Sequence, residues 1–130
     1  MKTRNINQKV FFKASPKEVY DALMDSRKHA RFTQDKARIS PKVGGRFSAY
    51  SGYITGINLE LVQGRKIVQI WRASNWPEEH ESRVTFNLKD HNGGTMLEFL
   101  HEDVPFDEYS SLKQGWTDFY WNPMKETFGW

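Results

Sequence analysis

The sequence contains no cysteine, and this absence removes several classes of protein at once. The chain cannot form a disulfide scaffold, use a thiol nucleophile or bind zinc through thiolates. No apolar run approaches the roughly 20 residues of a membrane helix, and the charged N-terminus lacks the hydrophobic segment of a secretory signal. We therefore expect a cytoplasmic protein with no membrane partner.

Sequence motifs of the common enzyme classes are missing as well. No nucleophile elbow, dinucleotide-binding glycine loop or P-loop occurs. The histidines lack the i, i+4 spacing of a helical zinc pair, and no second ligand cluster supports the acidic tip made by Glu78, Glu79, His80 and Glu81. The sequence predicts no catalytic residue, metal or cofactor, and a cyclase or hydrolase would have only His101 as a base.

Aromatic residues are abundant, and they determine the expected interior. Phe, Trp and Tyr make up 15% of the 130 residues, which excludes a disordered chain. A chain of this length buries about two-thirds of the surface that its unfolded form exposes. We expect one domain over residues 1–130, with a core or a cavity built largely from rings.

The first third of the chain predicts one strand followed by two short helices. Residues 6–13 have the composition of a strand. Ser15, Pro16 and Glu18 form a helix start with a capping box, and the next apolar residues fall on one helical face: Val19, Tyr20, Leu23 and Met24. A second helix is expected over residues 27–32.

The remainder predicts a strand meander and one long helix. Strands are expected over residues 47–50, 53–62, 66–73, 82–89 and 95–102. In the second of these, Ile57, Leu59 and Leu61 alternate with polar residues, as on a sheet with one apolar face. Residues 108–128 return to helical period, with Pro123 expected to kink or divide the helix, and carry a ring-rich stripe: Tyr109, Leu112, Trp116, Phe119, Tyr120 and Met124.

This order indicates an α+β protein in which a curved antiparallel sheet of about six strands grips a long C-terminal helix. It is the helix-grip order of the START and birch-pollen-allergen-like superfamily. Within that superfamily the chain resembles the C-terminal domain of the activator of the ninety-kilodalton heat-shock chaperone ATPase. The resemblance covers residues 14–129 and rests on seven segments in register: 44–47, 67–72, 76–78, 94–95, 104–105, 114–116 and 125–129.

The resemblance implies a non-catalytic module that binds the ninety-kilodalton chaperone. The eukaryotic activator also has an N-terminal domain that grips the chaperone's middle segment, and these 130 residues leave no room for it. The superfamily at large binds apolar small molecules between sheet and helix. A carrier of a small hydrophobic ligand is therefore the alternative function.

The ring-rich interior is either a closed core or the lining of a ligand cavity, and the sequence leaves both open. The residues concerned are Trp71, Phe86, Leu97, Phe99, His101, Trp116, Phe119 and Tyr120. His101 shares a strand face with Leu97 and Phe99. It is either a polar group of the cavity or a structural histidine with a local partner.

Charge is distributed unevenly, and this asymmetry suggests a partner surface. Residues 1–46 hold twelve Lys or Arg against four Asp or Glu, whereas the remainder holds seven against twelve. The predicted partner-binding residues are Lys28, Arg31, Lys36, Arg38, Lys42, Arg46 and the loop residue Trp76. The alternatives are a solvated basic face and a tryptophan that packs back on its own sheet. No nucleic-acid-binding motif accompanies the basic residues, so we expect no nucleic acid partner.

Overall fold

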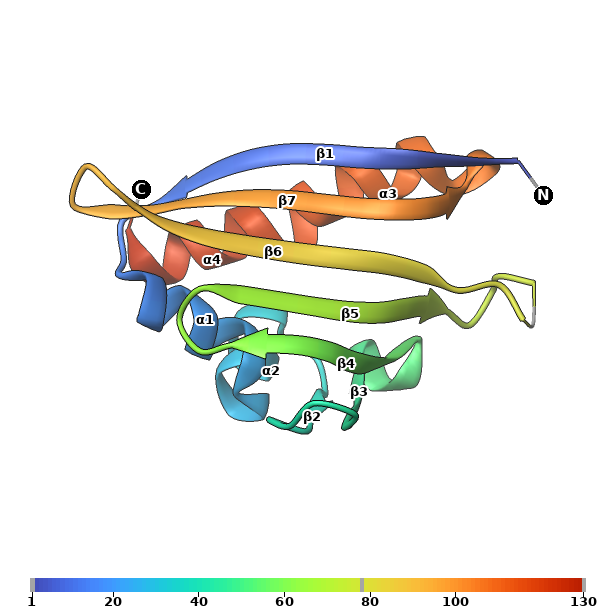
Figure 1. Ribbon diagram of the computed structural model, residues 1–130, viewed down its shortest axis with the longest axis horizontal. Helices are drawn as coiled ribbons and strands as arrows, with labels where there is room; N and C mark the ends of the chain where they lie inside the picture. Colours follow the sequence, from blue (N-terminus) through green and yellow to red (C-terminus); the bar gives the residue numbers. More distant parts are fainter. Residues whose placement is uncertain (1, 78, 130) are drawn as a thin grey trace.

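A single antiparallel sheet of seven strands forms one layer of the computed structural model, which describes residues 2–77 and 79–129. The α-helices lie together behind the sheet in Figure 1. The strand order is β1-β7-β6-β5-β4-β3-β2, so only the β1–β7 pair joins strands distant in sequence. The predicted α+β helix-grip architecture is confirmed, with one short edge strand that the sequence did not predict.

The N-terminal segment follows the predicted order of β1 (Thr3–Phe12), α1 (Pro16–Met24) and α2 (Ser26–Thr33). The capping box is present: the Glu18 N–H donates to Ser15 Oγ at 3.2 Å, and the Ser15 N–H donates to the Glu18 carboxylate at 3.2 Å. The predicted apolar face of α1 is buried against the sheet: Val19, Tyr20, Leu23 and Met24.

One edge of the sheet is formed by β2 (Arg38–Ile39), which pairs with β3 (Arg46–Ala49), and the other by β1. The Ile39 N–H donates to Ser26 Oγ at 2.9 Å, and the Ser26 hydroxyl donates to the Ile39 carbonyl at 3.4 Å. A side chain of α2 therefore occupies the backbone groups that β2 turns away from β3.

The meander continues through η1 (Tyr50–Gly52), β4 (Ile54–Val62), β5 (Lys66–Ala73), β6 (Ser82–His91) and β7 (Gly94–Pro105). The predicted strands are confirmed, and the last two extend further than expected. The hairpin between β6 and β7 turns at two residues with positive φ, as a tight right-twisted hairpin requires.

The orientation of β4 differs from the expectation. Asn58 points inward and is 1% exposed, whereas Ile57 and Leu59 are 36% and 37% exposed on the other face. Asn58 Nδ2 donates to the carbonyls of Ser40 at 2.7 Å and Lys42 at 3.0 Å. These hydrogen bonds satisfy the buried amide. A bulge between Asn58 and Glu60 then shifts the pairing of β4 with β5.

The C-terminal helix runs without a break through η2 (Phe106–Glu108), α3 (Tyr109–Trp116), the π-helical η3 (Thr117–Trp121) and α4 (Asn122–Phe128). Pro123 does not divide it. The Phe119 carbonyl would be the α-helical acceptor for residue 123, which as proline has no N–H. It instead accepts a hydrogen bond from the Tyr50 hydroxyl at 3.2 Å.

The π turn corrects the predicted stripe at one position. Phe119 is 57% exposed, whereas Trp121 is 2% exposed and stacks on Trp116 with ring centroids 5.6 Å apart. A π turn contains one residue more than an α turn, so the residues after it are rotated relative to a regular helix. The expected helical period placed Phe119 in the interior because it did not include this extra residue.

Candidate functional site

Aromatic rings from three strands and the C-terminal helix meet between the two layers. Trp71 of β5 and Phe99 of β7 lie 5.6 Å and 4.5 Å from Trp116, measured between ring centroids. Tyr120 lies one turn further along the helix, 4.6 Å from Trp116. All four side chains are buried. The rings meet mostly at tilted or edge-on angles, the arrangement that aromatic quadrupoles favour.

His101 lies in this cluster as the centre of a buried hydrogen-bond chain. Trp116 Nε1–H donates to His101 Nδ1 at 3.1 Å, so the other ring nitrogen carries the proton. His101 Nε2 then donates to Ser82 Oγ at 2.7 Å, and the Ser82 hydroxyl donates to the Trp71 carbonyl at 2.6 Å. This chain runs in one direction from the helix through β7 and β6 to β5.

The chain explains how a histidine fits in an apolar interior. His101 is fully buried, and burial lowers its pKa to about 3, so the ring is neutral at pH 7. Both ring nitrogens have protein partners. His101 therefore joins sheet to helix and has no free nitrogen to act as a base.

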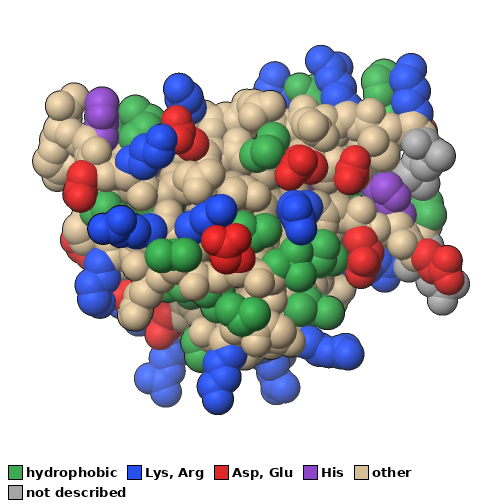
Figure 2. Space-filling model, viewed as in Figure 1, with side chains coloured by type: hydrophobic (Ala, Val, Ile, Leu, Met, Phe, Trp, Pro, Cys, Tyr) green, Lys and Arg blue, Asp and Glu red, His purple; other side chains and the backbone are tan. Residues whose placement is uncertain are grey.

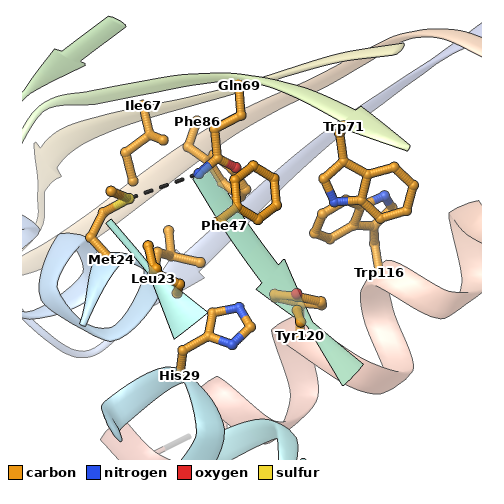
Figure 3. A pocket seen from close by; sticks show the side chains of 12 residues that line it. Leu23, Met24, His29, Phe47, Ile67, Gln69, Trp71, Phe86, Trp116 and Tyr120 are labelled. Atoms are coloured by element: carbon orange, nitrogen blue, oxygen red, sulfur yellow. Dashed lines mark hydrogen bonds between the residues drawn. The ribbon is translucent and has the colours of Figure 1, made fainter. Parts of the chain in front are cut away.

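A closed cavity of about 20 Å³ remains beside the ring cluster. Met24, His29 and Tyr120 converge on it from three helices, and Gln69 from the sheet (Figure 3). Burial lowers the pKa of His29 to about 4, and His29 Nδ1 has no partner among the described residues. A space of this size suits about one water molecule and is far below the several hundred Å³ of a ligand pocket.

An open groove of about 290 Å³ lies between η1 and the C-terminal helix. Trp71, Trp116 and Tyr120 belong to both spaces, so these rings separate the groove from the closed cavity. The other lining residues come from the turn before β4 and from the helix: Tyr50, Tyr53, Ile54, Ser111, Leu112, Gly115 and Phe119.

The rim of this groove holds an uncommon backbone conformation. Tyr50 and Ser51 have φ values of 51° and 55°, a left-handed region that few non-glycine residues adopt. The Ser51 hydroxyl donates to Asp35 Oδ1 at 2.5 Å, and the Tyr50 hydroxyl bonds the helix at Phe119. Burial raises the pKa of Tyr50 to about 12, so this hydroxyl remains a donor at pH 7. Backbone strain of this kind is often concentrated at binding sites.

The predicted cavity residues therefore divide into three groups. Trp71, Trp116, Phe119 and Tyr120 line the groove, and Phe86 lines the closed cavity with three of these rings. Leu97, Phe99 and His101 are buried in the packed core and line neither space.

Trp76 lies inside the molecule. It is 5% exposed and lies 5.4 Å from the Trp71 ring and 5.6 Å from the His80 ring. His80 Nε2 in turn bonds the Asp103 carbonyl at 2.7 Å, which ties the loop to β7. The loop tryptophan therefore packs on its own sheet and presents no surface to a partner in this structure. Glu78, part of the predicted acidic tip in the same loop, lies outside the described residues.

The six predicted basic residues gather along the β2 edge of the sheet and the adjoining helix α2. Figure 2 shows Lys and Arg side chains projecting along the lower side of the molecule, where Figure 1 places β2. All six are exposed, and none forms an ion pair with a described residue: Lys28, Arg31, Lys36, Arg38, Lys42 and Arg46. We call this set the basic edge.

Comparison with known proteins gives the family. The family described as "Activator of Hsp90 ATPase homolog 1-like protein" matches residues 13–129. The chain belongs to this family. An activator of 90 kDa heat shock protein ATPase homolog from Dictyostelium discoideum is 35% identical over 127 residues, covering 97% of this chain and 33% of that relative. Homolog 1 from Homo sapiens is 33% identical, covering 98% and 38% respectively.

Solved structures of activator-family proteins share the fold. The crystal structure of an HSP90 activator from Plasmodium falciparum superposes with a TM-score of 0.89 at 26% identity, covering 96% of each chain. The Aha1 dimer from Colwellia psychrerythraea gives a TM-score of 0.82 at 20% identity, covering 97% of each chain. The activator-family chain described here spans about a third of the length of the curated relatives it matches.

The described residues of this activator-family chain contain neither a clustered metal site nor a membrane-spanning helix. No three His, Asp or Glu side chains come together there as a metal site. No helix in that part of the chain has the length and apolarity to cross a membrane.

Sequence reasoning missed the residues that complete both spaces. Tyr50, Tyr53 and Leu112 line the groove, and His29 and Gln69 line the closed cavity. The run of an aromatic residue, serine and glycine at 50–52, directly after a strand, was the one local signal of an unusual turn. The position of His29 depends on how α2 packs on the C-terminal helix, which no local pattern reveals.

Proposed function

We propose that the chain is a non-catalytic binding module that docks on the 90-kDa heat-shock chaperone as an activator-type cochaperone. The curated relatives support this partner, because they are named as activators of that chaperone's ATPase and are about one-third identical to this chain. Since the chain covers only about a third of their length, the extent of activation by this domain alone is part of the proposal.

The basic edge is the observation that supports docking. Its six cations are exposed and have no ion-pair partner among the described residues. Unpaired charges of one sign on one side of a molecule accelerate association with a surface of opposite sign and make it dependent on salt. An acidic surface on the chaperone is the complementary partner.

The test is a titration of isotope-labelled protein with purified chaperone, with and without nucleotide, read by amide chemical shifts. Saturable shifts are expected in residues 27–46. Reversing three cations of the basic edge, Lys36→Glu with Arg38→Glu and Lys42→Glu, is expected to weaken binding at least tenfold and to reduce its dependence on salt.

A matched variant controls for net charge. Lys13→Glu with Arg65→Glu and Lys113→Glu changes the net charge by the same amount at exposed positions outside the basic edge. It is expected to bind with nearly the original affinity. Equal affinity of the basic-edge variant and the unsubstituted protein would refute docking through these residues.

The open groove favours a second function, the binding of a small apolar ligand. Its volume of about 290 Å³ is close to the lower limit for ligand pockets, and its lining is mostly aromatic. Tyr50, Tyr53, Ser111 and Tyr120 bring hydroxyl-bearing side chains to this lining. The hydroxyls of Tyr50 and Tyr53 donate to the Phe119 carbonyl and to Asn75.

The dye 1-anilinonaphthalene-8-sulfonate offers a direct test of this groove. Phe119 is more than half exposed, so Phe119→Ser removes part of the wall without opening the core. Saturable dye fluorescence that this variant weakens would support the groove. Unchanged dye affinity in the folded Phe119→Ser protein would count against it.

A further inference from the structure

The outer face of the sheet, opposite the helices, has an aliphatic strip over β4 and β5. One row of paired residues crosses four strands, from Arg46 of β3 through Ile57 and Ile70 to Arg83 of β6. Figure 2 looks onto this face and shows hydrophobic side chains near its centre, with both Lys or Arg and Asp or Glu side chains around them. Two apolar residues in mid-sheet are thus flanked by a guanidinium on each side.

The strip is wider than this row. Ile57, Leu59 and Val62 of β4 are 36%, 37% and 42% exposed. Leu59 occupies the bulge in β4, and Asn58 faces the interior between Ile57 and Leu59. The hydrogen bonds of Asn58 to Ser40 and Lys42 hold this orientation and thereby keep aliphatic side chains in solvent.

The flanking arginines are outside the ion pairs of the described residues. Arg46 and Arg83 are exposed, and neither forms an ion pair with a described residue, although Arg83 pairs across the strands with Glu102. Arg46 also belongs to the basic edge, so the strip and that edge are continuous. An apolar centre with a charged rim is the usual organisation of a protein interface.

We propose that Ile57, Leu59, Val62 and Ile70 form the apolar centre of the docking surface, and that Arg46 and Arg83 contact carboxylates around an apolar spot on the partner protein. The identity of that partner rests on the proposed function above. The two arginines without an ion-pair partner among the described residues favour an acidic surface, and the aliphatic centre supplies contact area that is removed from water on binding.

The chemistry of the strip favours a protein over a nucleic acid. Single-stranded nucleic acid is held by aromatic side chains on which the bases stack, together with cations along the backbone. The strip has aliphatic side chains at its centre, and these contact apolar protein groups rather than stacked bases.

The test compares chaperone affinity across three variants. Ile57→Thr with Leu59→Thr places β-branched threonine, which suits strands, at both exposed positions and removes much of the apolar surface. A tenfold or greater loss of affinity with an unchanged salt dependence is expected. Arg83→Gln lies outside the basic edge and is expected to reduce the salt dependence. Phe106→Thr is the control, because Phe106 of η2 is 43% exposed outside the strip and its loss should leave affinity unchanged.

The outcomes separate the two proposals. Binding by the unsubstituted protein that the threonine pair leaves intact would overturn the strip and leave the proposed function standing. An absence of binding by the unsubstituted protein would overturn both. Tighter binding of a single-stranded oligonucleotide than of the chaperone, with shifts at residues 57–59, would assign the face to nucleic acid and overturn the proposal as stated. Urea unfolding of each variant confirms that it remains folded.

Discussion

Removing one oxygen atom from the interior should destabilise this fold measurably, and Ser82→Ala is the change. Ser82 is 2% exposed and its hydroxyl joins His101 Nε2 at 2.7 Å to the Trp71 carbonyl at 2.6 Å. Alanine leaves the buried imidazole N–H without an acceptor, which costs about 1–3 kcal/mol, and also removes the bond to Trp71, worth about 1 kcal/mol. We expect the free energy of unfolding to fall by about 2–4 kcal/mol.

Urea unfolding at pH 7 measures this loss. The five tryptophans provide a fluorescence signal, and a lower midpoint with an unchanged slope would identify a change in stability alone. Ser111→Ala is the control: Ser111 is exposed on the groove wall, so a change within about 0.5 kcal/mol is expected. A double-mutant cycle with Trp116→Phe should show coupling, because Trp116 and Ser82 bond opposite nitrogens of the same ring.

Two results would refute the reasoning. One is a Ser82→Ala protein as stable as the original, since that would show that the imidazole N–H finds another partner. The other is nitrogen chemical shifts that place the proton of His101 on Nδ1, because the bond from Trp116 then could not form as described.

Three further predictions concern acid, the sheet and the helix. Burial lowers the pKa of His101 to about 3 and of His29 to about 4 from the ordinary 6.5. Below pH 6.5 the unfolded chain therefore binds more protons at these histidines than the folded protein does. Stability should therefore fall from pH 6.5 toward pH 4 by up to about 1.4 kcal/mol per pH unit for each histidine, with His29→Phe removing its share of the slope in urea titrations. Gly56→Ala should cost at least about 1–3 kcal/mol in thermal unfolding, because its methyl group would overlap the Ile70 carbonyl; unchanged stability would contradict this. Trp116→Ala should cost about 3–5 kcal/mol and abolish dye uptake, and a folded variant with undiminished uptake would contradict the groove.

Local sequence patterns predicted the parts of this fold that local chemistry determines. The capping box of Ser15 and Glu18 depends on residues three apart, and it is present with both hydrogen bonds. The alternation in β6 places Val84, Phe86 and Leu88 inside as expected. The partners of the capping box are near in sequence, and the period of β6 is regular. Each local pattern is therefore sufficient to predict the structure that forms.

Long-range polar contacts were the part that patterns could not reveal. Ile57 and Leu59 indicated the wrong inner face of β4, because Asn58 obtains its partners from Ser40, Lys42 and Gln69 on other segments. Leu61, beyond the bulge, packs against the core as expected. The π turn likewise involves a long-range contact. Pro123 leaves the Phe119 carbonyl without its α-helical donor, and the Tyr50 hydroxyl, far away in the sequence, donates to it. The sequence predicted which residues form the ring cluster. It did not show that His101 has a structural role or that Phe119 lies at the groove, because both depend on the three-dimensional packing.

The hydroxyl of Ser26 at the sheet edge has a consequence for how this protein can assemble. An open strand edge is a template on which a second chain, of its own kind or another, can extend a sheet. Ser26 already occupies the outward N–H and carbonyl of Ile39, so β2 offers no template at that residue. A partner that binds at Ile39 must therefore be recognised through side chains. At high concentration, the protein should not polymerise by adding strands at this residue. Ser26→Ala would expose that template while leaving the cations around it unchanged.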